Sequence, residues 1–304
     1  MLRTPLLYMS QRKTVKHAIM AVPLSRRVAL RFVAGDTLEN AIDAIGALNR
    51  AGIRVTLDHL GENVSDVEAT KRAADSYVEA LHRIAVARVD GNVSVKLTQM
   101  GLDISYGLCR ENVVRILEAA SAMGNFVRID MESHEYVDRT LQMYAELRAR
   151  GYENVGLVIQ SYLYRSEEDV DGLLKQGARV RLVKGAYNEP GSVAYPHKRD
   201  VDANFLRLAA KLLEGGNYPA VATHDEKIIR WTKRFAAEHA VEPRRFEFQL
   251  LYGVRRDLQE RLANEGYNVR AYVPYGNDWY GYLMRRIAER PANLFFVLGN
   301  LFRG

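Results

Sequence analysis

Short runs of β-branched and apolar residues alternate with segments of helical periodicity, and beyond residue 52 this alternation occurs eight times. The short runs predict strands and the longer periodic segments predict helices. We expect the strands at residues 54–60, 92–97, 125–131, 156–162, 178–185, 220–224, 246–252 and 269–275. We expect the helices at residues 66–88, 109–123, 135–150, 166–176, 201–214, 226–239, 255–265 and 278–290.

Strands that alternate with helices predict parallel βαβ units, because parallel strands need long crossover connections. Eight such units predict an α/β fold of the (β/α)8 type, a closed TIM-like barrel whose active site lies at the carboxyl ends of the strands. No Gly-x-Gly-x-x-Gly motif follows any of the expected strands, so an open dinucleotide-binding sheet loses its main support.

The first 50 residues have helical patterning, with a helix start at Asp36-Thr37 and apolar residues at helical spacing from Leu38 to Leu48. We therefore expect an N-terminal helical extension over residues 1–50, packed on a barrel over residues 52–304. No linker, repeat or low-complexity segment interrupts the chain, so we expect residues 1–304 to form a single domain.

The composition is that of a globular protein of 304 residues, with 48% hydrophobic residues. No apolar stretch is long enough to span a membrane and the N-terminus lacks a signal peptide, so we expect a cytoplasmic protein. Cys109 is the single cysteine, which excludes an internal disulfide. The net charge of +6 is spread among 37 acidic residues without a basic tract, so we expect no nucleic-acid partner.

Polar residues gather where the expected strands end, which is where such barrels place their chemistry. Each of them could instead form an ion pair or cap the following helix. Together they favour a ligand site, because charged groups in a barrel mouth cost several kcal/mol unless they are paired or bind a ligand. These residues are Asp58, His59, Lys96, Arg128, Asp130, Glu132, Gln160, Arg181, Lys184, Thr223, His224, Asp225, Glu247, Gln249, Arg270 and Tyr272.

The last expected helix carries Tyr282, Arg285, Arg286 and Glu289 on one face, at the spacing i, i+3, i+4 and i+7. Two adjacent arginines offer two donor forks to one small anion, which suits the carboxylate of a compact amino or keto acid. The alternative is a solvated amphipathic helix whose arginines pair with the glutamate and with water.

The basic residues at the strand ends allow more than one interpretation. Arg181 and Lys184, with Arg128, form a basic wall suited to a diphosphate or to the anionic edge of a reduced flavin. Lys96 is either a Schiff-base nucleophile, as in barrel aldolases, or the partner of a carboxylate such as Asp130. Spacing alone leaves both open.

Metal and serine-nucleophile chemistry find little support in the sequence. His59, His224 and Asp225 are potential ligands, but no His-x-His or His-Glu-x-x-His motif is present, so we expect no metal. A Gly-x-Ser-x-Gly elbow is also missing.

The chain resembles the proline dehydrogenases, which are FAD-dependent barrel enzymes, and is most similar to their monofunctional bacterial form. The most specific motifs are RAYVPYG at residues 270–276 and YLMRRIAE at residues 282–289. Supporting motifs are SVKL at 94–97, RIDME at 128–132, VIQSY at 158–162, RLVKGAY at 181–187, ATHD at 222–225 and FEFQLLYG at 246–253. Two departures are Asp225, where many relatives carry asparagine, and Ser161, which replaces a small apolar residue.

The resemblance implies roles for individual residues and a last helix that lies over the barrel mouth. Arg285 and Arg286 would bind the carboxylate of L-proline, and Tyr272 and Tyr282 would line its ring. Lys96, Asp130 and Glu289 would complete the polar frame of the site, and the catalytic residues would be Lys96, Asp130 and Arg181. The residues matching the FAD site are Arg128, Gln160, Arg181, Lys184, Gly185, Ala186, Thr223, His224 and Gln249.

The implied reaction is the oxidation of L-proline to Δ1-pyrroline-5-carboxylate, with hydride transfer to N5 of FAD, as the first step of proline catabolism. The resemblance also implies a quinone acceptor, and the positive charge is compatible with transient contact with the inner face of an anionic membrane. The alternatives are a Schiff-base aldolase or lyase using Lys96 or Lys184, a non-enzymatic binder of polyanions, and a flavoenzyme for a related imino acid. The sequence leaves the oligomeric state open.

Overall fold

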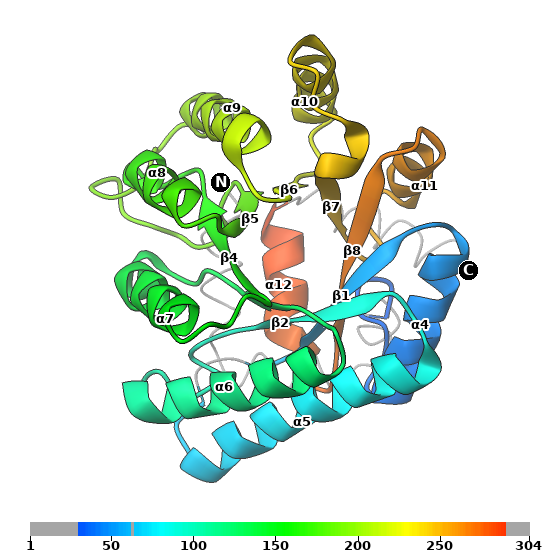
Figure 1. Cartoon of the computed structure of the whole chain (residues 1–304), viewed down its shortest axis with the longest axis vertical. Helices are drawn as coiled ribbons and strands as arrows, with labels where there is room; N and C mark the ends of the chain where they lie inside the picture. Colours follow the sequence, from blue (N-terminus) through cyan, green and yellow to red (C-terminus); the bar gives the residue numbers. More distant parts are fainter. Residues whose placement is uncertain (1–29, 62–63, 290–304) are drawn as a thin grey trace.

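Eight parallel strands close into a barrel in which each strand pairs with its neighbours in sequence, and β8 pairs with β1 (Figure 1). The structure is a computed structural model and describes residues 30–61 and 64–289, with side chains to Met284. The strands are β1 Arg54–His59, β2 Gly91–Val95, β3 Val127–Ile129, β4 Val155–Gln160, β5 Arg179–Val183, β6 Ala220–Ala222, β7 Glu247–Leu251 and β8 Asn268–Tyr275. The predicted closed barrel is confirmed.

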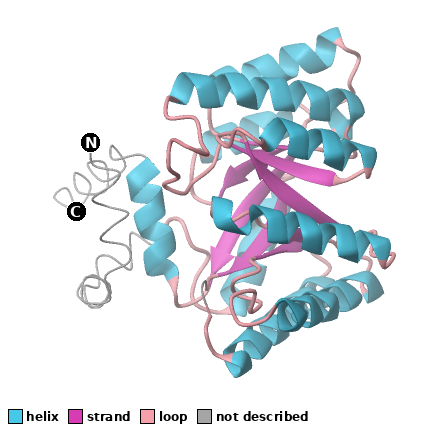
Figure 2. Ribbon diagram, turned by 90° about the vertical axis from the view of Figure 1, so that its left-hand side faces the viewer, coloured by secondary structure: helices cyan, strands magenta, loops and turns pink. Residues whose placement is uncertain are grey.

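Helices α4 to α11 form a ring around the barrel, and α12 lies outside this ring (Figures 1 and 2). They are α4 Leu38–Arg50, α5 Val67–Ala87, α6 Tyr106–Ala122, α7 Val137–Ala149, α8 Ser166–Lys175, α9 Lys198–Gly215, α10 Glu226–Glu238, α11 Arg256–Asn264 and α12 Trp279–Glu289. Short 3-10 turns at His134–Tyr136 and Pro243–Arg245 precede α7 and β7. None of the helices formed by the described residues is both long enough and apolar enough to cross a membrane.

Strand residues alternate between an apolar outer face and a polar inner face. On β2, Val93 and Val95 belong to the apolar core with the surrounding helices, whereas Asn92 and Ser94 bond to polar groups of the adjacent strands. Residues two apart on a strand share a face, so polar residues accumulate inside the barrel. The main hydrophobic core therefore lies between the sheet and the helix ring, and the barrel interior is largely polar.

Helix α4 packs against β1 and β8 on the outside of the barrel. Thr37 caps it by accepting from the backbone N–H of Asn40 at 3.3 Å, as the predicted start at Asp36-Thr37 requires. Helix α4 directly precedes β1. It therefore occupies the position outside β8 that the helix following β8 would otherwise take. Residues 1–29 of the expected extension lie outside the described part of the chain.

Helix α12 lies across the end of the barrel, as Figure 2 shows at the left. Trp279, Tyr280 and Leu283 form a small apolar cluster with Phe32 and Leu60, separate from the main core. Leu60 follows β1, so this cluster holds α12 over the carboxyl ends of the strands. The expected position of the last helix over the barrel mouth is thus observed.

The element boundaries differ from the expected ones mainly in β3 and β6, which contain only three residues each. The apolar run that predicts β3 starts at Asn125, but the Asn125 side chain donates to Gly91 O at 2.9 Å and accepts from Phe126 N at 2.7 Å. Side-chain bonds of this kind replace ladder bonds at a strand start, which shortens the strand.

Candidate active site

A cavity of about 700 Å³ opens at the carboxyl ends of the strands, under α12. It is lined by residues of β1 and of β4 to β8, by Lys96, which follows β2, and by Asp130 and Met131, which follow β3. Its lining also includes Asp58, Gln160, Arg181, Lys184, Gly185, Ala186, Tyr187, Lys198, Thr223, His224, Asp225, Gln249, Arg255, Tyr272 and Tyr282. The polar strand ends therefore converge on one space.

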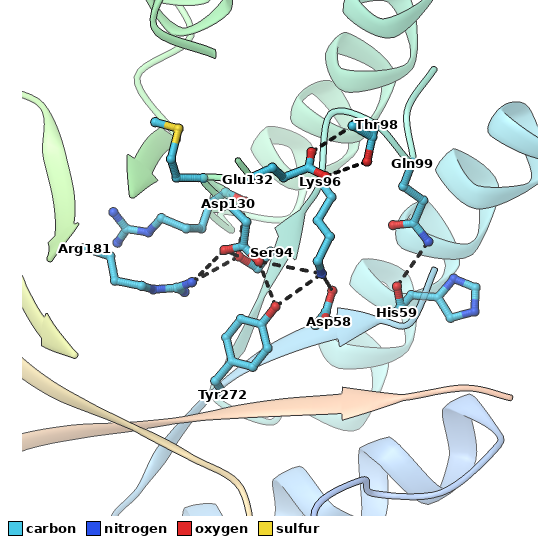
Figure 3. A network of polar contacts seen from close by, with 12 residues as sticks. Asp58, His59, Ser94, Lys96, Thr98, Gln99, Asp130, Glu132, Arg181 and Tyr272 are labelled. Atoms are coloured by element: carbon cyan, nitrogen blue, oxygen red, sulfur yellow. Dashed lines mark hydrogen bonds and ion pairs between the residues drawn. The ribbon is translucent and has the colours of Figure 1, made fainter. Parts of the chain in front are cut away.

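Lys96 lies at the centre of a buried ionic network in this cavity (Figure 3). Its Nζ is 2.7 Å from Asp58 Oδ1 and 3.8 Å from Asp130 Oδ2, and its side chain is 8% exposed. Asp58, on β1, is 1% exposed. Lys96 is thus held between two carboxylates, and its removal would leave the buried Asp58 without its ion-pair partner.

Asp130 joins Lys96 to the opposite wall of the cavity. Arg181 Nη1 donates to Asp130 Oδ1 at 2.8 Å, Ser94 Oγ donates to the same oxygen at 2.6 Å, and Tyr272 Oη donates to Oδ2 at 2.7 Å. Burial acts to raise the pKa of Asp130, but the charges of Arg181 and Lys96 outweigh it and hold the pKa below its ordinary value. Asp130 is therefore a carboxylate at neutral pH.

Tyr272 contributes a protonated hydroxyl to the network. Burial, and then the negative charge of Asp130, raise the pKa of Tyr272 well above its usual range. The Arg181 guanidinium also lies over the Tyr272 ring, 5.3 Å from its centroid. The ring therefore holds its position between a carboxylate and a cation.

Arg181 and Gln160 line the cavity, and both carry polar atoms without a hydrogen-bond partner in the described part of the chain. Arg181 Nε and Nη2 and Gln160 Oε1 are buried and have no hydrogen-bond partner among the described residues. Gln160 Nε2 donates to the carbonyl oxygens of Met131 and Glu132 at 3.3 and 3.1 Å, which orients its amide. Buried polar groups without partners are costly, so this wall is suited to a ligand that supplies an acceptor and a donor.

A second charged cluster lies at the far end of the cavity, around Lys184. Its Nζ forms ion pairs with Asp225 Oδ2 at 2.9 Å and with Asp202 Oδ1 at 2.5 Å, and Lys198 also reaches both carboxylates. Burial acts to raise the pKa of Asp225, but the hydrogen bond and charge of Lys184 lower it to about 2. The side chains of Lys184, Asp202 and Asp225 are about a quarter exposed and that of Lys198 is 71% exposed, so this part of the cavity faces solvent.

Gly185 and Ala186 bring backbone into the cavity wall directly after β5. Gly185 has φ +116°, and a Cβ there would lie 2.5 Å from the ring of Tyr162. The resemblance places Gly185 at the cofactor site, where a glycine lets the backbone approach a ligand closely. The structure gives a further reason: the Tyr162 ring fills the space that any side chain would need.

The segment after β6 places Thr223 and His224 on the cavity wall. Thr223 Oγ1 accepts from Asp225 N at 3.1 Å, which shapes the turn into α10. His224 Nε2 accepts from Leu251 N at 3.0 Å, so in a neutral ring the proton is on Nδ1. On β7, Gln249 Nε2 donates to Glu247 Oε1 at 2.5 Å.

Arg128 does not line the cavity, contrary to its expected place beside the cofactor. It is 3% exposed and donates to the backbone oxygens of Leu157 and Arg179, which lie deeper in the barrel. Its side chain also lies over the Phe126 ring, 5.0 Å from the centroid. Arg128 lies on β3 and Asp130 follows the strand; Arg128 precedes Asp130 by two residues and therefore lies one layer lower in the barrel.

Tyr282 lines the cavity from α12 and is 5% exposed. The backbone of Arg285, Arg286 and Glu289 belongs to the same helix. Their side chains lie outside the described part of the structure, so the carboxylate clamp stays a prediction.

Sequence reasoning missed that Asp58, rather than Asp130, is the nearer partner of Lys96. The signal was present, because Asp58 ends an otherwise buried run on β1, which neighbours β2. It also missed Ser94, Asp202 and Arg255, none of which belongs to a distinctive strand-end charge pattern.

The arrangement of both lysines disfavours Schiff-base chemistry. A Schiff-base nucleophile must be a neutral amine, whereas Lys96 and Lys184 each contact two carboxylates. Of the expected strand-end residues, eleven line the cavity: Asp58, Lys96, Asp130, Gln160, Arg181, Lys184, Thr223, His224, Asp225, Gln249 and Tyr272. His59, Arg128, Glu132, Glu247 and Arg270 do not line it.

Comparisons with known proteins agree with this picture. Residues 41–298 match the proline dehydrogenase family. The chain is 44% identical over 303 residues to proline dehydrogenase 1 of Bacillus subtilis (strain 168), with 100% of both chains covered. It is 46% identical over 281 residues to proline dehydrogenase of Deinococcus radiodurans, with 91% of each covered.

Among solved structures, proline utilization A (PutA) from Bdellovibrio bacteriovorus, inactivated by N-propargylglycine, is similar with a TM-score of 0.79 and 27% identity. The match covers 86% of this chain and 32% of that chain, so the present protein spans about a third of that larger one. With the family match over most of its length and full-length relatives, the chain belongs to the proline dehydrogenase family.

Proposed function

We propose that the protein oxidises L-proline to Δ1-pyrroline-5-carboxylate in the cavity under α12, with FAD as the cofactor and hydride acceptor. The observation that carries this proposal is the pairing of two features on one cavity. A charge-balanced network around Lys96 and Asp130 lies beside the open polar atoms of Arg181 and Gln160.

The residues present fit a flavin. Arg181 Nε and Nη2 offer donors, and Gln160 Oε1 offers an acceptor, on the wall of a cavity of about 700 Å³. Donors next to a ring that gains electrons stabilise its reduced, anionic form. The residues that would hold the cofactor are Gln160, Arg181, Lys184, Gly185, Ala186, Thr223, His224 and Gln249. When bound, FAD supplies an acceptor for hydride at N5.

The protein residues around the substrate would act through position and charge. Lys96, held between Asp58 and Asp130, would serve as a fixed cation and not as a base. Tyr272 keeps its hydroxyl proton and donates a hydrogen bond to Asp130. Holding a small substrate in one orientation lowers the barrier by several kcal/mol.

The proline carboxylate would be bound by Arg285 and Arg286 from α12, with Glu289 pairing with these cations. Tyr282, two turns or less from each of them, reaches the cavity. The ring would pack between Tyr272 and Tyr282. A helix held across the barrel mouth by its own apolar cluster supports this arrangement, because it presents one face to the cavity.

We further propose a quinone as the electron acceptor, reached by transient contact with the inner face of an anionic membrane. The net charge of +6 favours such contact, since each basic residue near an anionic surface contributes about 1 kcal/mol. The cytoplasmic location follows from the same proposal.

The purified protein, made with ample riboflavin, tests this function by its visible spectrum. We expect flavin absorbance that bleaches on anaerobic addition of L-proline and does not bleach with L-alanine, which lacks the ring. A colourless protein that gains no absorbance with added FAD would refute the cofactor. A yellow protein that L-proline leaves unbleached would refute the substrate.

A further inference from the structure

The segment between β5 and α9, residues 184–197, forms part of the cavity wall and is held from behind by one buried carboxylate. Its first residues, Lys184 to Tyr187, line the cavity. Glu189 follows them and points away into the protein, where its side chain is only 3% exposed. A carboxylate this buried needs donors to offset its lost hydration.

Glu189 binds two separate parts of the fold. Its Oε1 accepts from the backbone N–H of His134 at 2.9 Å and from the Tyr162 hydroxyl at 3.1 Å, and its Oε2 contacts His134 Nδ1. His134 begins the turn between β3 and α7, and Tyr162 follows β4. One side chain thus ties the β5–α9 segment to the ends of two neighbouring strands.

Tyr162 links Glu189 to the residues of the cavity wall. Its ring lies where a Cβ of Gly185 would be, at 2.5 Å, and its backbone N–H donates to Lys184 O at 2.9 Å. The same residue's carbonyl accepts from Tyr195 N at 2.7 Å. A Tyr162 ring held at its hydroxyl end by Glu189 therefore supports Lys184 and Gly185 from below.

We propose that Glu189 is a positioning residue, which acts through Tyr162 to hold residues 184–187 in the conformation that binds the cofactor. The proposal rests on the proposed function for the identity of that cofactor. Glu189 itself does not line the cavity. Its removal should therefore speed cofactor release more than it weakens substrate binding, since Lys96, Asp130 and Tyr272 are held by contacts of their own.

The test measures FAD release from the purified holoenzyme, by the rise in flavin fluorescence after dilution, in Glu189→Ala, Glu189→Gln and Tyr162→Phe. We expect release at least about tenfold faster in Glu189→Ala, because two donors lose a charged acceptor. Glu189→Gln keeps the oxygen but loses the charge, and Tyr162→Phe keeps the ring on Gly185 but loses the hydroxyl. Both should show smaller increases.

Glu135→Ala is the matched control, because Glu135 lies beside His134 but is exposed. Its release rate should stay within about twofold of the wild type. In the same samples, with excess FAD, the KM for L-proline of Glu189→Ala should change by less than about threefold. A release rate in Glu189→Ala equal to that of the control, or a KM that rises as much as the release rate, would overturn the proposal.

Two further outcomes are decided by the same set of proteins. If Glu189→Ala does not fold, wild-type release in both Glu189→Gln and Tyr162→Phe overturns the proposal. If the wild type binds no FAD, the proposed function fails and the anchorage is judged by amide hydrogen exchange of residues 184–187. Faster exchange in Glu189→Ala than in Glu135→Ala then supports the anchorage, and equal exchange refutes it.

Discussion

The barrel contains two buried ionic networks at different heights, and they differ in what lies next to them. The upper network joins Lys96, Asp58, Asp130 and Arg181, and all four line the cavity. The lower network is centred on Glu247, which pairs with Arg270 at 3.0 Å and accepts from Tyr218 Oη at 3.2 Å. Neither Glu247 nor Arg270 lines the cavity.

Burial and ion pairing are nearly the same in the two networks. Arg270 and Arg181 are 6% and 4% exposed, and Glu247 is 2% exposed. The difference lies in the hydrogen bonds of the two arginines. Arg270 donates to Glu247 and to Val55 O at 2.8 Å, whereas Nε and Nη2 of Arg181, which lines the cavity, have no hydrogen-bond partner among the residues that the structure describes. A buried charged pair therefore indicates chemistry only where it borders a cavity, and otherwise indicates packing of a polar barrel interior.

The largest effect should follow from breaking the lower network. Arg270→Met leaves Glu247 buried without its main partner, and we expect a loss of about 3–5 kcal/mol in the free energy of unfolding. Chemical denaturation measures this loss. Arg234→Met, at an exposed position on α10, is the control and should change stability by less than about 1 kcal/mol. Equal stability of both variants would contradict the structural role of Arg270.

The pH dependence of stability should report the same carboxylate. Burial acts to raise the pKa of Glu247, but Arg270 lowers it to about 2 from 4.5. A depressed pKa in the folded state stabilises the protein above the unfolded pKa, and this stabilisation is lost as the pH falls from about 4.5 towards 2. The contribution is about 3 kcal/mol.

Glu247→Gln should remove this dependence, so its stability should fall less than that of the wild type over the same pH range. Denaturant titrations at several pH values compare the two proteins. Parallel curves would show that Glu247 does not have a depressed pKa.

Breaking the upper network should instead affect activity. Arg181→Met removes the donors proposed to stabilise the reduced flavin, and we expect kcat to fall by about 100-fold or more with FAD retained. Steady-state kinetics with L-proline and the flavin content measure the two quantities. Arg270→Met, assayed at a temperature where it is folded, is the matched comparison and should retain kcat within about tenfold. A larger loss of kcat in Arg270→Met than in Arg181→Met would contradict the distinction between the two networks.

A smaller effect should come from α12, which is predicted to bind the carboxylate of L-proline above the upper network. Arg285→Met and Arg286→Met should each raise the KM for L-proline at least about tenfold with FAD retained, because each loses a charged contact worth about 1.5–3 kcal/mol. Initial rates over a range of L-proline concentrations give KM. An unchanged KM in both variants would remove the clamp and leave only the strand-end residues as the substrate site.

The fold was predictable from the sequence because its signals are local. Strand and helix periodicity, and the glycine and polar residues between them, identify eight repeated units, and parallel units of this number close into a barrel. The start of α4 is likewise predictable from Thr37 and from the helical spacing of the apolar residues that follow it. Most of the polar residues that line the cavity could be predicted as a set, because the active site of such a barrel lies at the carboxyl ends of its strands.

The height of a residue inside the barrel was not predictable in this way. Arg128 and Arg181 both lie on the inner faces of short strands, yet only Arg181 reaches the cavity. The register between strands decides this, and Arg181 pairs with Ala220 at one edge and Val158 at the other. Register follows from the tilt and shear of the whole barrel, which no single segment encodes.

The amino-acid sequence by itself determined the order of strands and helices, the polar character of the strand ends and the resemblance to a family, because each depends on neighbouring residues along the chain. Only the tertiary structure decided that Asp58 is the closer partner of Lys96, that Arg128 serves the barrel interior, and that Glu189 reaches Tyr162 and His134. These pairs are far apart in sequence, and a hydrogen bond or ion pair forms only when two atoms approach within a few ångströms. That approach is set by how the closed barrel brings its strands together.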